Sequence, residues 1–181
     1  MPPPPLDPAQ VRGVMEKAVN GFIRPGYDHF RRSAETLEDS MKAFCAAPSA
    51  TTEKTAKDAF ADTVSSWSTI EIVRVGPVIE QNRFERVLYY PDKKGLGLKQ
   101  VQRYLSDKDE SVTTAEGLSG KSVAAQGLGA LEFILYGTGA NGKSVFVNTL
   151  ATILGDYATN APMDTFMEAR GDRHPTDLAG L

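Results

Sequence analysis

The sequence lacks the features that mark several specialised classes of protein. Its one cysteine, Cys45, excludes an internal disulfide framework. No apolar run approaches the roughly 20 residues that a membrane-spanning helix requires. The N-terminal MPPPPLDP has neither the basic nor the apolar region of a secretory signal. As written, the chain is therefore expected to stay in the cytoplasm.

The sequence also lacks the excess of lysine and arginine that nucleic-acid-binding proteins carry. Lys and Arg number 20 against 23 Asp and Glu, which gives a formal net charge of −3 at pH 7. The segment from Gly137 onward is itself richer in acidic than in basic side chains. Without a basic patch, nucleic acid is not an expected partner. The apolar fraction of 41% and the charged fraction of 24% are ordinary for a globular protein.

Amphipathic helical patterns occupy much of the chain. After a Pro-rich lead over residues 1–6, expected to be disordered, Asp7-Pro8 provides an N-cap and a proline at the first helical position. A break is predicted at Arg24-Pro25-Gly26, followed by a second helix whose apolar seam spans residues 27–44. A third helix carries the apolar positions of residues 60–70. Three long amphipathic helices with short connections predict an antiparallel bundle.

The C-terminal part of this region is predicted to close the bundle. Residues 98–105 form a further helical face after several turn signals. Residues 120–136 are predicted as one helix packed on the helix of Trp67, because Val123, Leu131 and Ile134 share a face.

A phosphate-binding pattern begins where these helices end. Residues 137–144 fit G-x-x-x-x-G-K-[ST], in which glycines let backbone N–H groups curl around phosphates. Lys143 would meet the terminal phosphates and Ser144 the Mg²⁺. An apolar helical pattern follows through residue 154. The nucleotide-binding candidates are Gly137, Gly139, Asn141, Gly142, Lys143 and Ser144.

The stretch GTGANGKSVFVNTLATILGDYATNAP, followed by RHPTDLAGL, resembles the ATPase domain of phage and plasmid primase-helicases of superfamily three. The resemblance covers residues 137–181 and implies ATP and Mg²⁺ as ligands. Hydrolysis is not expected, because the acidic residue, sensor and arginine finger of such a motor are missing. A P-loop also follows a buried strand. Residues 133–136 could be that strand, but a helix end is favoured because no sheet is predicted for it to join.

A second resemblance covers residues 6–136. The residues that carry it are Trp67, Glu71, Arg74, Gly76-Pro77, Asn82-Arg83, Tyr90-Pro91-Asp92, Gln100-Val101 and VAAQGLGALE over 123–132. They look like the N-terminal half of an imelysin-like protein. The resemblance implies a helical fold, a periplasmic location and an association with iron uptake and its components. The family was first described as a peptidase family.

The hallmark of that family is G-x-H-x-x-E. Gly127 and Glu132 match its ends, but Gly129 stands at the histidine position. The resemblance implies iron or another divalent metal as cofactor, yet Glu132 alone supplies only one carboxylate. From the residues alone, pairing of Glu132 with a buried arginine is favoured over a ligand role. No catalytic residue is assigned, and an enzyme is not the favoured interpretation.

A possible structural or ligand cluster comprises Trp67, Glu71, Arg74 and Arg83. Near the following turn, Arg83 joins Glu85 and Arg86 in a mixed-charge group that could clamp a small anion or orient loops. Glu71 and Arg74 lie three apart, a spacing that supports an ion pair on a helix. The structural role is favoured.

The sequence therefore predicts a mainly α fold in three parts: the lead over residues 1–6, an incomplete imelysin-like antiparallel helical bundle over 7–136, and a short P-loop-helix remnant over 137–181. Three functional hypotheses remain. The first is an imelysin-like protein with a non-catalytic binding or structural role, and the second is an ATP-binding primase-helicase fragment. The third is a fused reading frame, joined at the shared word Leu135-Tyr136-Gly137.

Overall fold

The computed structural model describes residues 7–137 and is helical throughout its regular elements, so the predicted mainly α fold is confirmed. No strand occurs within those residues. The elements are α1 (Pro8–Ala18), η1 (Val19–Ile23), α2 (Arg24–Ala46), α3 (Ala50–Ile70), η2 (Gly76–Asn82), α4 (Arg83–Val87), α5 (Leu96–Asp107), η3 (Glu110–Thr113), α6 (Ala115–Ser119), η4 (Val123–Ala125) and α7 (Gly127–Tyr136).

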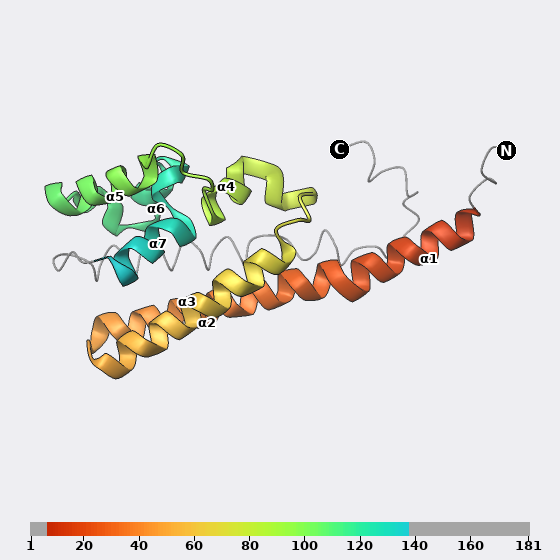
Figure 1. Cartoon of the computed structure of the whole chain (residues 1–181), viewed down its shortest axis with the longest axis horizontal. Helices are drawn as coiled ribbons and strands as arrows, with labels where there is room; N and C mark the ends of the chain where they lie inside the picture. Colours follow the sequence, from red (N-terminus) through yellow and green to blue (C-terminus); the bar gives the residue numbers. More distant parts are fainter. Residues whose placement is uncertain (1–6, 138–181) are drawn as a thin grey trace.

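The first two predicted helices form one continuous rod (Figure 1). The break predicted at Arg24-Pro25-Gly26 is wrong, because the π-helical turn η1 carries the chain into Pro25. The Arg24 N–H donates to the Val19 carbonyl, five residues back. A proline has no N–H, and its ring crowds the carbonyl four residues earlier. The wider turn is a common way for a helix to absorb such a defect.

Because the rod does not fold back, α1 is not part of the bundle. None of its residues is buried, and the side chains of Val14 and Met15 are 67% and 49% exposed. The bundle is instead built on the antiparallel pair of α2 and α3, joined by a short turn that Ser49 and Thr52 cap.

Buried hydroxyl groups hold α2 and α3 close together. The Ser33 and Ser66 hydroxyl oxygens are 2.7 Å apart, and the Thr63 hydroxyl donates to the Ser33 carbonyl at 3.1 Å. Just beyond α3, the Tyr27 hydroxyl donates to the Val73 carbonyl at 2.7 Å, and burial raises the pKa of Tyr27 to about 12. Small side chains allow the close approach, and their polar groups are satisfied internally.

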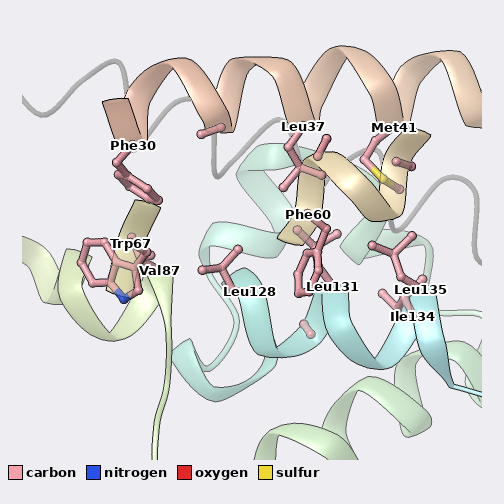
Figure 2. Close-up of a cluster of buried hydrophobic side chains, with 14 of the residues drawn as sticks. Phe30, Leu37, Met41, Phe60, Trp67, Val87, Leu128, Leu131, Ile134 and Leu135 are labelled. Atoms are coloured by element: carbon pink, nitrogen blue, oxygen red, sulfur yellow. The ribbon is translucent and has the colours of Figure 1, made fainter. Parts of the chain in front are cut away.

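Helix α7 packs its apolar face on α3, the helix of Trp67, as predicted. In Figure 2, Leu131 of α7 faces Phe60 of α3, and Leu37 and Met41 of α2 lie above Phe60 in the same core. The helix does not span residues 120–136, however, because it begins at Gly127 after an extended Gln126. The residues before it form two separate elements, α6 over 115–119 and η4 over 123–125.

Within the described part of the chain, no helix is long and apolar enough to cross a membrane.

Candidate functional site

A hollow of about 450 Å³ lies beside α7, opposite its core-facing side. Its walls are residues 88–92, the first turns of α5, part of η4 and the outer face of α7. The polar side chains among its lining are those of Asp92, Gln126 and Glu132, and the aromatic ones are Tyr89, Tyr90, Phe133 and Tyr136. We refer to it as the α7 hollow.

The helical period of α7 places the histidine and glutamate positions of the hallmark, 129 and 132, in this hollow. Leu128, Leu131 and Ile134 point into the core, so Gly129 and Glu132, three residues apart, share the opposite face. A histidine at position 129 would thus stand beside the carboxylate of Glu132. The structure brings together the residues that the hallmark pattern singled out.

Gly129 leaves open space in the α7 hollow. A Cβ atom built on Gly129 meets no atom within 4 Å, whereas the Gly127 position is tightly enclosed. Glu132 is exposed and has no hydrogen bond or ion pair within residues 7–137. Its predicted pairing with a buried arginine is therefore not formed there.

Asp92, the other carboxylate of the hollow, is already engaged. Its oxygens accept hydrogen bonds from the Leu96 N–H at 2.7 Å and the Gly97 N–H at 2.9 Å. These N–H groups lie at the start of α5 and have no acceptor within the helix, so a negative charge there is favourable. Glu132 is consequently the unpaired carboxylate of the lining.

The backbone at position 127 requires glycine, for a reason that the sequence pattern did not reveal. The φ of Gly127 is +68°, and an added Cβ would lie 2.2 Å from the Arg86 carbonyl oxygen and 2.3 Å from that of Val87. Only glycine allows the start of α7 to approach the end of α4 so closely.

Gln126 anchors the same junction, a role that the sequence reasoning missed. Its Nε2 donates to the Leu118 carbonyl at 2.9 Å and to the Lys121 carbonyl at 2.8 Å, and its Oε1 accepts from Arg86 Nη1 at 3.0 Å. A single polar amide within the apolar stretch VAAQGLGALE was the sequence feature that could have indicated this role. The network fixes where α7 begins and hence which residues face the hollow.

The predicted cluster of Trp67, Glu71, Arg74 and Arg83 lies elsewhere, since none of the four lines the α7 hollow. Trp67 is 1% exposed, and its ring centroid is 5.3 Å from that of Phe84. The Arg74 guanidinium covers the Phe84 ring at 3.9 Å. The predicted Glu71–Arg74 ion pair is not formed, because Arg74 Nε instead meets the Glu71 backbone carbonyl at 3.4 Å.

Arg83 is held by the loop that precedes it. Its Nη1 donates to the Pro77 carbonyl at 2.8 Å and pairs with Glu80 at 3.1 Å. These contacts leave Arg83 tied to the Gly76-Pro77 turn. Arg83 and Arg74 therefore do not form a joint anion site, because Arg74 is stacked on Phe84.

The P-loop candidates fall almost entirely outside the described residues. Gly137 follows α7, and its N–H donates to the Phe133 carbonyl at 2.7 Å. Gly139, Asn141, Gly142, Lys143 and Ser144 lie beyond residue 137. Residues 133–136 form the last turn of α7, so the alternative of a strand before the loop is wrong and the favoured helix end is confirmed.

Within residues 7–137, no three His, Cys, Asp or Glu side chains are grouped so that they could hold a metal ion. The α7 hollow therefore offers carboxylate, tyrosine hydroxyl and aromatic surfaces. Such a lining can contact a ligand through hydrogen bonds, aromatic ring faces and negative charge.

Comparison with known proteins identifies the family. The model of the Imelysin family matches residues 23–166, which continues past Gly137, and no match supports the resemblance to a primase-helicase. No curated protein matches. An imelysin-like protein from Psychrobacter arcticum 273-4 has the same fold, with a TM-score of 0.81 and 22% identity over 90% of this chain. The chain spans about half of that protein, covering 52% of its length. This chain belongs to the imelysin family.

Proposed function

We propose that this chain is a non-catalytic binding domain of the imelysin type whose ligand site is the α7 hollow. Family membership supports a periplasmic location and an association with iron-uptake components. The observation that carries the proposal is the outer face of α7. There Glu132 has no partner among residues 7–137 and lies beside the open space at Gly129.

The chemistry of this face argues against a resident metal. Fe²⁺ and Zn²⁺ are held in proteins by several ligands, and metal-assisted hydrolysis needs a firmly held ion. Glu132 supplies one carboxylate, and Asp92 uses its oxygens to cap α5. We therefore propose that the hollow binds its ligand without a divalent metal and without peptidase chemistry.

Titration with Zn²⁺ or Fe²⁺ is the first test. Calorimetry is expected to show no stoichiometric tight site in the full chain, because one carboxylate cannot complete a coordination sphere. The Glu132→Gln variant should give the same isotherm. Stoichiometric binding that disappears in Glu132→Gln would contradict the proposal.

The Gly129→His variant provides the matched gain of function. The new side chain meets no neighbour within 4 Å of its Cβ and lies three residues before Glu132 on the same face. We expect Zn²⁺ affinity to rise about tenfold or more over the parent, equivalent to about 1.4 kcal/mol. The double variant Gly129→His/Glu132→Gln should lose most of this gain. No gain in Gly129→His would mean that the two positions cannot share an ion.

The pattern at residues 137–144 is the observation that favours a second candidate function, ATP binding. A P-loop gains its geometry from the strand before it, and residues 133–136 are helical. A P-loop without that strand must fix the positions of its N–H groups at the expense of the binding energy. Calorimetry with Mg²⁺ and ATP is expected to give a Kd no tighter than roughly millimolar, about −4 kcal/mol. Micromolar binding lost in Lys143→Ala would favour the ATP-binding function.

The division at residue 136 between an imelysin-like part and a P-loop remnant stays a prediction. The family match through residue 166 favours a later boundary. Limited proteolysis followed by mass measurement would locate it.

A further inference from the structure

We propose that the α7 hollow recognises an organic cation, such as a quaternary ammonium group, between its tyrosine rings and the carboxylate of Glu132. The inference rests on the proposed function in taking the hollow as the binding site, and it adds the chemical class of the ligand.

The charge of the lining is the first argument. Asp92 and Glu132 are acidic, and no described lining residue is a lysine, arginine or histidine. Lys93 and Lys94 are exposed next to Asp92 but do not line the hollow. Because the N-terminus of α5 compensates Asp92, the uncompensated charge belongs to Glu132. An anion would be repelled, and a neutral ligand would leave this charge unused.

The aromatic lining is the second argument. Tyr89, Tyr90, Phe133 and Tyr136 all contribute to the walls, and the faces of aromatic rings attract cations. Tyr90 is 83% exposed and Tyr136 is 52% exposed, so both can contact a ligand. Tyr136 already interacts with one cation, since Lys57 Nζ of α3 lies 5.1 Å from its ring centroid. Aromatic rings are the usual surroundings of a bound quaternary ammonium ion, and a nearby carboxylate adds charge attraction.

The shape of the hollow is the third argument. Its volume of about 450 Å³ lies within the range of small-molecule sites. Gly129 adds room next to Glu132, because no atom lies within 4 Å of its Cβ position. The space that a hallmark histidine would fill is thus available to the ligand. An ammonium group carries its own charge and needs only one carboxylate, unlike a divalent metal ion.

Choline and its neutral isostere 3,3-dimethyl-1-butanol are the probes that test this idea. Calorimetry on the full chain is expected to show that choline binds about tenfold or more tightly than the isostere, because only choline gains the cation–π and carboxylate interactions. Glu132→Gln should remove that preference. Tyr90→Leu should weaken choline binding as well, and this exposed position carries little risk to folding. Glu85→Gln, an exposed carboxylate outside the hollow, is the matched control and should leave it unchanged.

Gly129→His gives an independent check, because an imidazole in the hollow should reduce choline affinity while it raises Zn²⁺ affinity. Equal binding of choline and the isostere, or an unchanged preference in Glu132→Gln, would overturn the cation proposal. The Zn²⁺ titration of the parent chain tests the proposed function separately from the cation proposal. Tight Zn²⁺ binding there would instead contradict the proposed function.

Discussion

The Gly127→Ala variant is expected to lose about 3 kcal/mol or more of its free energy of unfolding. The glycine has a φ of +68°, a region that costs other residues about 1–2 kcal/mol. The added Cβ would also lie 2.2 Å from the Arg86 carbonyl oxygen. Overpacking of this kind typically costs about 1–3 kcal/mol. The Arg86 carbonyl belongs to the backbone, so it cannot rotate away from the added Cβ. Urea unfolding followed by circular dichroism measures the loss.

Gly129→Ala is the matched control, two residues along the same helix. Its Cβ meets no atom within 4 Å, and no positive φ is involved. Alanine favours helix over glycine, so we expect this variant to be more stable than the parent by a few tenths to about 1 kcal/mol. Equal unfolding midpoints for the two variants would show that the start of α7 does not pack on α4 as described.

Trp67→Ala is expected to cost about 3–5 kcal/mol, the range for deleting a large buried aromatic side chain. Trp67 is 1% exposed and packs between Phe30 and Phe84, with ring centroids 5.0 Å and 5.3 Å away. In Figure 2 its ring lies beside Val87 and below Phe30, at one end of the core. Its loss would open a cavity between α2, α3 and α4. Thermal and urea unfolding should both show the change.

Trp67→Phe separates packing from hydrogen bonding. The buried Nε1 of Trp67 has no hydrogen-bond partner within the described residues. Phenylalanine therefore gives up ring volume but no polar contact, and it should cost less than half as much as alanine. If the two variants are equally destabilised, the indole N–H must have a partner that the packing does not account for.

The three hallmark positions have separable roles in this chain. Gly127 permits the contact between α7 and α4, and Gly129 leaves room in the α7 hollow. Glu132 faces that hollow and has no partner within the part of the chain that the structure describes. The face that we propose to bind the ligand thus lies on a well-packed helix, although the hallmark's nitrogen donor is absent. This arrangement explains why stability and ligand binding should respond to different substitutions.

The sequence by itself determined the helical class and most of α2, α3 and α7. The apolar spacing of residues 27–44 predicted the face of α2 that buries Phe30, Leu37 and Met41. Such patterns are reliable because neighbours three or four apart must share a helix face whatever surrounds them. The GxxxxE remainder of the hallmark likewise pointed to Gly127, Gly129 and Glu132 before any geometry was known.

Only the tertiary structure decided how these elements meet. Pro25 looked like a break because its local chemistry opposes a helix, and the π-helical turn that absorbs it depends on the whole rod. The start of α7 depends on contacts with residues distant in sequence, namely Arg86 with Gln126 and the α4 carbonyls with Gly127. The same long-range packing formed the α7 hollow and placed Glu132 in its lining. Pairings between distant residues depend on the full set of packed elements, and no local pattern encodes them.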